Sequence, residues 1–327
     1  MKKELLIAVA ILSAVSASAA TPAKPDMNIL HVQVILDKLG FAPGVLDGKG
    51  GQSLEGALRG FQTSRGLKLT GKTDAATLRE LHQYRAWRPV VTLTLSPTVL
   101  QGPFTNPVPK EPAEQAKLSG LHYRNAMEAL AERFHTTMDT LVALNGPEAR
   151  LAPGTRLVFP NAVPTSRAYA TKNTNWAATL GSLNVSAEQP RAKRIVVDKS
   201  ESVLKVYDAA DKLVAQFPAT MGSQYDPLPI GKWTIKGVAY NPPFHYNPDL
   251  FWDADAKDEK AKIPAGPNGP VGVVWIDISK PHYGIHGTPE PRTIGRAESH
   301  GCIRLSNWDA ARLSLMVEAG VPAVFQI

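Results

Sequence analysis

The sequence predicts a multidomain fold, with a mainly β C-terminal domain preceded by a small three-helix domain and a small α/β module. A chain of 327 residues is longer than one ordinary domain. The apolar pattern changes near residue 191 from helical spacing to short alternating strands, and the 27 prolines include dense stretches typical of stiff linkers. The boundaries we expect are 1–19 for a signal peptide, 26–84 for the three-helix domain, 85–117 for a proline-rich linker, 118–161 for the α/β module, 162–190 for a second linker and 191–327 for the β domain.

The first segment has the pattern of a cleavable secretory signal. Lys2 and Lys3 precede an apolar run from Leu5 to Val15, and Ala17-Ser18-Ala19 provides an Ala-x-Ala cleavage site. The run is shorter than the ~20 residues that span a bilayer. We therefore expect export, with no stable membrane insertion after the signal is cleaved.

Residues 26–84 predict three short helices joined by glycine turns. Ile29, Val32, Ile35, Leu36 and Leu39 recur at helical spacing before Gly40, and similar apolar faces follow from residue 53 and from residue 74. The segment resembles the peptidoglycan-binding domain 1 family, which implies docking to wall glycan or stem peptide. The resemblance is carried by Gln33, Leu36, Leu39-Gly40-Phe41, Asp47-Gly48, Ala57-Leu58, Phe61-Gln62, Gly66-Leu67, Gly71 and Thr77-Leu78.

The segment from Trp87 to Lys117 is rich in proline, so its beginning could pair as strands while its end reads as an extended spacer. Residues 118–161 then predict two helices and a short closing strand. Leu144-Asn145 and the phrase from Pro153 to Pro160 resemble a LysM module, although Leu121–Arg124 is a poor match to the opening strand of that family. The resemblance implies binding to glycan that contains N-acetylglucosamine.

The final segment predicts a β domain with one C-terminal helix. Strands are expected at 195–197, 203–207, 213–218, 233–235 and 273–278, and a helix capped by Ser306 or Asn307 ends at Gly320. Residues 247–269 are rich in glycine, proline and charge, so they predict a long loop, either a lid over the site or an insertion with no role.

Cys302 is the only cysteine of the chain, and it lies in Ser299-His300-Gly301-Cys302-Ile303-Arg304, sixteen residues after His286. A thiolate is a strong nucleophile, and a nearby imidazole can take the thiol proton and return it to a leaving amine. A single cysteine cannot form an internal disulfide in an exported chain. This pattern predicts acyl-transfer chemistry, whereas a buried structural cysteine is the alternative.

These residues resemble the signature of the L,D-transpeptidase family, also called YkuD-domain proteins. The match reads Tyr283-Gly284-Ile285-His286-Gly287-Thr288, twelve residues from Gly287 to Glu298, and then the stretch that contains Cys302. Many members carry Asn two residues after the cysteine, where this chain has Arg304. The resemblance extends over the whole final ~135 residues and implies a periplasmic enzyme associated with peptidoglycan.

The resemblance also implies the roles of single residues. Cys302 would be the nucleophile, His286 the proton acceptor and donor, and the Gly301 and Cys302 amides an oxyanion hole. Ser299 and His300 would shape the loop around the sulfur. Substrate would be bound by Arg304, Tyr283 and Gly287, with a structural role as the alternative.

Three functions from different classes follow. The first is a transpeptidase that joins a stem tetrapeptide donor to an amine acceptor, forming 3-3 cross-links or attaching the lysine of an envelope lipoprotein to the wall. The second is an L,D-carboxypeptidase or endopeptidase, in which water resolves the same acyl-enzyme. The third is a non-catalytic peptidoglycan-binding protein, in which the two N-terminal modules bind the wall, including its glycan strands. The net charge of +7 is dispersed, with no basic run interleaved with aromatics, so it favours an anionic wall polymer over nucleic acid. No cofactor and no metal site are expected, because the zinc-type donors lack a ligand spacing.

Overall fold

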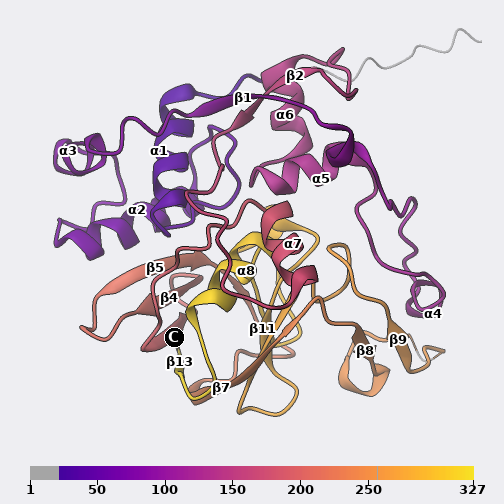
Figure 1. The fold of residues 1–327 in the computed structure, drawn as a ribbon. Helices are drawn as coiled ribbons and strands as arrows, with labels where there is room; N and C mark the ends of the chain where they lie inside the picture. Colours follow the sequence, from indigo (N-terminus) through magenta and orange to yellow (C-terminus); the bar gives the residue numbers. More distant parts are fainter. Residues whose placement is uncertain (1–21, 256) are drawn as a thin grey trace, which may run out of the picture.

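The structure is a computed structural model that describes residues 22–255 and 257–327. The signal peptide predicted at 1–19 lies outside the described residues. Figure 1 shows the helical N-terminal units on one side and a large, twisted β domain on the other. Within the described ranges, no helix is both long enough and apolar enough to cross a bilayer.

The N-terminal unit contains the three predicted helices, α1 (Met27–Lys38), α2 (Gln52–Arg65) and α3 (Ala75–His82). Gly66 ends α2 in the left-handed region at φ 64°, which glycine adopts without strain. Phe41 and Phe61 meet edge to face in the centre of this unit, with ring centroids 5.9 Å apart. The same apolar cluster includes Leu213 from the β domain, so this unit shares its core with the domain beside it.

The second unit has an opening strand that comes from the beginning of the proline-rich segment 85–117, where strand pairing was one of the expectations. Helices α5 (Ala126–Arg133) and α6 (Met138–Asn145) precede β2 (Arg156–Pro160), as predicted. The antiparallel partner of β2 is β1 (Val90–Thr94), with Val90 opposite Pro160 and Thr94 opposite Arg156. Residues 121–124, where the opening strand was expected, contact the β domain instead, since the N–H of Leu121 donates to the carbonyl of Ala265. The rest of the segment before α5 contains only η1 (Pro97–Leu100) and α4 (Pro112–Gln115).

The segment at 162–190, also expected to be a linker, contributes to the main core. Its helix α7 (Thr174–Ser182) buries Trp176 and Leu180 almost completely, and Leu183 and Val185 follow them inside. Trp176 and Leu180 are four residues apart, which places both on one helix face. This segment is therefore part of the β domain rather than a free spacer.

The β domain is built on a mixed sheet of nine strands in the order β5-β4-β3-β13-β7-β10-β11-β12-β6. One buried helix, α8 (Asn307–Met316), packs against it, with Trp308 fully inside. The strands are β3 (Arg194–Asp198), β4 (Val203–Tyr207), β5 (Leu213–Pro218), β6 (Thr220–Met221), β7 (Gly231–Tyr240), β10 (Val274–Ile278), β11 (Gly284–His286), β12 (Ile303–Arg304) and β13 (Pro322–Gln326).

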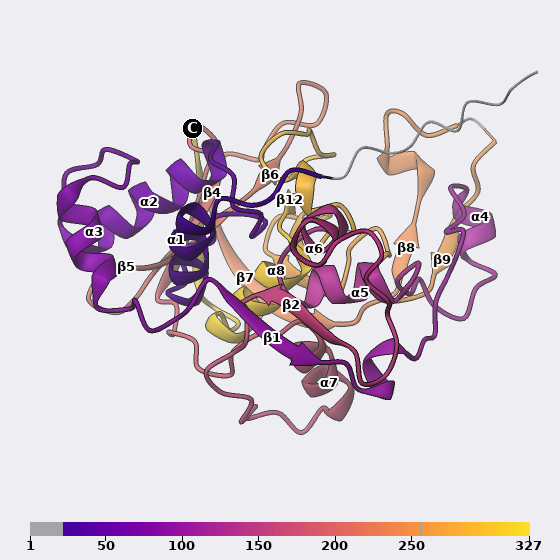
Figure 2. The same cartoon turned by 90° about the horizontal axis from the view of Figure 1, so that it is seen from above.

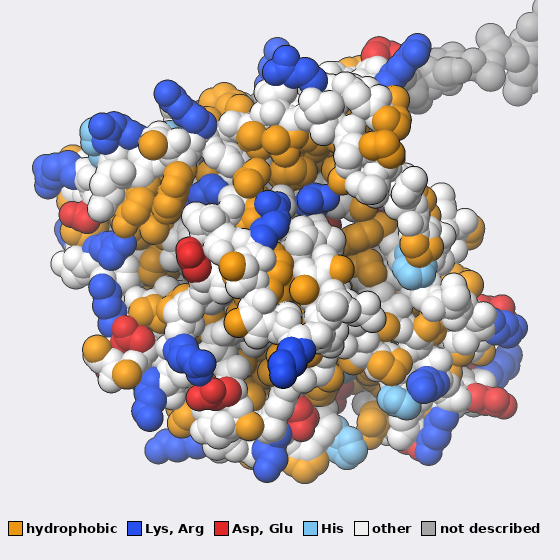
Figure 3. Space-filling view, in the orientation of Figure 1, with side chains coloured by type: hydrophobic (Ala, Val, Ile, Leu, Met, Phe, Trp, Pro, Cys, Tyr) orange, Lys and Arg blue, Asp and Glu red, His pale blue; other side chains and the backbone are white. Residues whose placement is uncertain are grey.

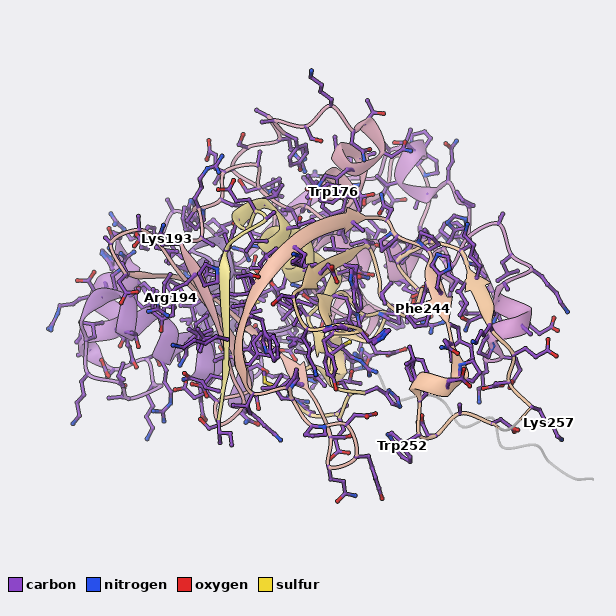
Figure 4. The ribbon with its side chains drawn as sticks, turned by 90° about the horizontal axis from the view of Figure 1, so that it is seen from below. Trp176, Lys193, Arg194, Phe244, Trp252 and Lys257 are labelled. Atoms are coloured by element: carbon purple, nitrogen blue, oxygen red, sulfur yellow. The ribbon has the colours of Figure 1, made fainter. Side chains whose placement is uncertain are left out.

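The predicted long loop at 247–269 is part of a small β-hairpin, whose first strand immediately precedes the loop and whose second strand lies within it. Strand β8 (Phe244–Tyr246) pairs with β9 (Ala261–Ile263), and a short helical turn, η2 (Pro248–Leu250), follows β8. In Figure 4 this hairpin stands at the side of the β domain, with Phe244 near its base and Trp252 near its tip.

Charged side chains from all three units meet in a buried junction beside α8. The guanidinium of Arg312 lies 3.1 Å from Asp37 Oδ1 and also donates to the Asp37 carbonyl at 2.7 Å. Nδ1 of His135 lies 3.1 Å from the other oxygen of Asp37, and the His135 ring stacks on Trp308. Because Asp37 is in α1, His135 follows α5 and Arg312 is in α8, this junction holds the units together. Figure 2 shows α6 and α8 near the middle of the view, with α1 to their left.

Candidate active site

The sheet brings the two motif segments together on adjacent strands. Strands β11 and β12 are parallel, with Ile285 opposite Ile303 and His286 opposite Arg304. The isoleucines are fully buried in the core. Because side chains alternate along a strand, His286 and Arg304 point to the other face, as does Cys302 one residue before β12. The candidate nucleophile and base therefore share one face of the sheet at diagonal positions of neighbouring strands.

The ring of His286 is held in one tautomer. Its Nδ1 lies 2.7 Å from the carbonyl oxygen of Gly287, and since a carbonyl only accepts, Nδ1 carries the proton. This leaves the lone pair on Nε2. Trp275, the register partner of His286 in β10, stacks on the imidazole at 5.6 Å between centroids and an angle of 17°. Burial, together with the charge of Arg304, lowers the pKa of His286 to about 4.

Cys302 is half-buried, and its sulfur lies 3.8 Å from the carbonyl of His282. Burial raises the pKa of the Cys302 thiol, although the N–H of Gly284 and the charge of Arg304 act in the opposite direction. Both members of the pair are therefore neutral near pH 7. The thiol needs a base at the moment of attack, and Nε2 of His286 has the free lone pair for that role.

Ser299 fastens the loop that carries the sulfur. Its hydroxyl donates to the Cys302 carbonyl at 2.7 Å and accepts from the N–H of Gly222 at 2.6 Å. The N–H of Ser299 donates to the Gly222 carbonyl at 3.2 Å. This residue thus ties both sides of the turn to the end of β6, which fits the predicted role of shaping the loop.

Gly301 occupies a position that only glycine fits. Its φ is 86°, and a Cβ atom there would lie 2.5 Å from Cε1 of Tyr283. The Tyr283 ring therefore packs directly on the backbone before Cys302. Gly301→Ala is expected to cost about 1–3 kcal/mol of stability from backbone strain alone and to displace the ring or the loop as well.

Gly295→Ala is the matched control for Gly301→Ala. Gly295 has a similar φ of 74°, but a Cβ atom there would meet nothing within 4 Å. We expect this variant to show the cost of strain in a thermal melt while keeping most of the rate at which Cys302 is acylated. Equal acylation rates in the two variants would contradict the importance of the contact with Tyr283.

The remaining predicted site residues surround the sulfur in different ways. Arg304 is half-buried on the face that carries His286 and Cys302. Gly287 faces protein rather than open space, because a Cβ atom there would lie 2.1 Å from Oδ1 of the buried Asn307. Gly287 therefore contributes in two ways. Its carbonyl accepts the hydrogen bond from Nδ1 of His286, and its lack of a side chain leaves room for Asn307.

His300 connects the loop that carries Cys302 to the hairpin. Its Nε2 lies 2.8 Å from Oδ1 of Asp253, and its ring meets the ring of Phe251 in a T-shaped arrangement with centroids 5.1 Å apart. Trp252 next to them stacks on Tyr225, with centroids 4.3 Å apart. The hairpin therefore lies against the candidate site, and the lid alternative gains a physical basis over that of an insertion with no role.

Sequence reasoning missed Trp275 and the positioning role of Asn307. Asn307 is fully buried, accepts from the N–H of Val273 at 3.1 Å and donates to the carbonyl of Pro267 at 3.0 Å. Only its capping potential is visible in the sequence, and Ser306 provides the cap instead. The alternation in 273–278 was a usable signal for Trp275, because it places that ring on a single face of the strand.

The described ranges 22–255 and 257–327 contain no group of three or more His, Cys, Asp or Glu side chains arranged to hold a metal ion.

Two family models match the chain. Residues 192–324 match the L,D-transpeptidase catalytic domain, YkuD, and residues 26–81 match the "Putative peptidoglycan binding domain". The "Putative L,D-transpeptidase YkuD" of Bacillus licheniformis is 33% identical over 127 residues, which cover 39% of this chain and 61% of that protein. The "Probable L,D-transpeptidase YbiS" of Escherichia coli is 31% identical over 137 residues, which cover 40% of this chain and 44% of that protein. The chain thus spans less than two thirds of the length of either relative.

Among solved structures, an "L,D-transpeptidase from Mycobacterium smegmatis" is 25% identical, with a TM-score of 0.33, over 41% of this chain and 58% of that one.

The two segments that match family models, 192–324 and 26–81, coincide with the β domain and with the three-helix unit. The chain therefore contains a YkuD L,D-transpeptidase catalytic domain and, N-terminal to it, a peptidoglycan-binding domain.

Proposed function

We propose that the protein is a cysteine-dependent L,D-transpeptidase that acts on peptidoglycan stem peptides. The observation that carries the proposal is the shared sheet face of Cys302 and His286, with Nε2 of the imidazole left free as a base. The matched catalytic domain names the reaction class, and the matched binding domain indicates the polymer on which it acts.

In the first half of the reaction, Nε2 of His286 takes the thiol proton as the sulfur attacks the carbonyl carbon of the amide that precedes the terminal D-Ala. The Gly301 and Cys302 amides would stabilise the developing oxyanion, with each such donor worth about 3 kcal/mol of barrier. The C–N bond then breaks, and His286 returns the proton to the departing amine of D-Ala. A thioester on Cys302 remains.

In the second half, an amine attacks the thioester, gives its proton to His286 and forms a new amide, and Cys302 leaves as a thiol. An amine of a neighbouring stem peptide gives a 3-3 cross-link, and the lysine of an envelope lipoprotein gives an attached protein. Water gives hydrolysis instead. We favour transfer because the matched domain is a transpeptidase domain.

We also propose that the protein acts at the cell wall after export, in the periplasm. The peptidoglycan-binding domain supports wall association. Figure 3 shows basic side chains scattered among acidic and apolar ones on one face, which suits broad attraction to an anionic polymer better than one nucleic-acid groove. The second unit, with β1, α5, α6 and β2 in LysM-like order, is proposed as a further glycan-binding module.

Mass spectrometry of the signal-free chain mixed with a disaccharide tetrapeptide tests the proposal. A mass added to Cys302 together with a cross-linked dimer supports transfer. An adduct followed by tripeptide alone indicates the hydrolase, and no adduct leaves only a wall-binding protein. Carbapenem-type β-lactams provide a second probe, because they are expected to acylate the same sulfur.

The neutral Cys–His pair predicts an unusual pH profile for acylation. The base works only when unprotonated, so the rate is expected to rise with pH through a midpoint near 4, the pKa that burial and Arg304 give His286. In Arg304→Gln, the loss of the positive charge should move this midpoint to higher pH. A stopped-flow titration of β-lactam acylation measures both curves, and a parent midpoint above about pH 6, near the ordinary histidine pKa, would contradict the geometry.

A further inference from the structure

A cleft of about 280 Å³ opens where the three units of the chain meet, away from the sulfur. The peptidoglycan-binding domain contributes the connection between α1 and α2. The second unit contributes the start of α6, and the catalytic domain contributes a loop at 291–296. The residues used below are Lys49, Ser53, Asp139, Arg292 and Arg296.

One loop that lines this cleft is hydrogen-bonded to the strand that pairs with β12, which directly follows Cys302. The loop at 291–296 lies between His286 and Cys302 in the chain. The N–H of Gly295 donates to Oγ1 of Thr220 at 2.8 Å, and Thr220 is the register partner of Arg304 in the pairing of β6 with β12. A ligand in the cleft would therefore contact a loop that is hydrogen-bonded to β6, the strand that pairs with β12.

The lining of the cleft suits an acidic peptide rather than a sugar platform. None of the described residues that line it is aromatic, whereas Lys49 and Arg296 are exposed and form no ion pair within the described part of the chain. Arg292 pairs with Asp139 at 2.8 Å across the gap between two units. Arginine and lysine side chains of this kind bind carboxylates.

The backbone of the cleft is also open. A Cβ atom added at Gly50 or Gly51 would meet nothing within 4 Å, so a ligand backbone can approach closely there. One oxygen of Asp47, Oδ1, accepts from the side chain of Gln33 at 3.1 Å and from the N–H of Lys49 at 3.0 Å. The described lining holds three basic side chains, Lys49, Arg292 and Arg296, against two carboxylates, Asp47 and Asp139, so its net charge is positive by one.

We propose that this cleft binds the acidic stem peptide of a second peptidoglycan strand while a first stem peptide reacts at Cys302. This inference rests on the proposed function, because it takes its ligand class from it. The binding domain would then present substrate to the catalytic domain through a shared surface, rather than anchor the enzyme from a distance.

The experiment uses the single thiol of the chain. In Cys302→Ala combined with Ser53→Cys, the only thiol lines the cleft, and its alkylation rate by a maleimide reports occupancy. A disaccharide tetrapeptide at ten times its Kd is expected to slow labelling about tenfold. Lys68→Cys in the same background is the matched control, because Lys68 is exposed in the same domain but outside the cleft, and its labelling should not change.

Adding Lys49→Glu and Arg296→Glu to the Ser53→Cys chain should remove the protection. Unchanged labelling of Ser53→Cys with the tetrapeptide would overturn the inference. So would equal protection by an N-acetylglucosamine oligomer without a peptide, because the ligand would then be glycan. The labelled variant carries Cys302→Ala, so its result does not depend on catalysis. Failure of the proposed function would show separately, as the absence of a thioester on Cys302 of the parent protein.

Discussion

Cys302→Ala is expected to abolish acylation by both stem tetrapeptide and β-lactam, with turnover reduced by about 10⁴-fold or more. The alanine side chain offers no atom to form the thioester, and no other cysteine is present to replace the sulfur. His286→Ala should keep the thiol but slow acylation by about 10² to 10⁴-fold, because the raised thiol pKa leaves little thiolate without a base. Intact-protein mass spectrometry against time measures both effects.

His82→Ala is the control for these two variants. His82 is exposed at the end of α3 in the binding domain, so its loss should not change the acylation rate. If His286→Ala were acylated as fast as His82→Ala, the base would have to be another group. An adduct on Cys302→Ala would show that another residue is the nucleophile.

Arg312→Ala is expected to lower the free energy of unfolding by about 3–5 kcal/mol, the usual cost of leaving one partner of a buried ion pair without its counter-charge. The side chains of Arg312 and Asp37 are 6% and 4% exposed, and the guanidinium makes two of the contacts that hold α1 to α8. Urea unfolding followed by tryptophan fluorescence measures the loss, since Trp308 is buried beside the junction.

Arg191→Ala is the matched control for Arg312→Ala. Arg191 also pairs with an acidic side chain, Glu318 at 3.0 Å, but the two are 83% and 71% exposed. An exposed pair typically contributes about 0–1 kcal/mol, so this variant should unfold close to the parent. A loss below about 1 kcal/mol in Arg312→Ala would contradict a structural role for the junction.

The junction also predicts a direction for the pH dependence of stability. Burial alone would raise the pKa of Asp37, but the charges of His135 and Arg312 outweigh it and lower the pKa from 3.8 to about 2. A carboxyl with a lowered folded-state pKa stabilises the fold above about pH 4, and this contribution is lost as pH falls through about 2. Asp37→Asn should therefore show a shallower loss of stability with acid than the parent.

The sequence by itself pointed to the proposed catalytic pair and predicted the three N-terminal helices. His286 and Cys302 lie sixteen positions apart in the motif that carries the resemblance to the L,D-transpeptidase family. The helices of the binding domain follow from apolar spacing and glycine ends, which are also local signals. Features of this kind need no knowledge of distant parts of the chain.

Only the tertiary structure decided how the units are joined and how the site is tuned. Only the structure shows that the partner of Val90 is Pro160, that Trp176 enters the core from a segment expected to be a linker, and that Asp37 meets Arg312 across 275 positions. The lowered pKa of His286 and the raised pKa of Cys302 depend mainly on burial. Burial is the sum of contacts with residues that are remote in the chain, so no local pattern encodes it, and it appears only once the sheet, its helix and the hairpin have packed together.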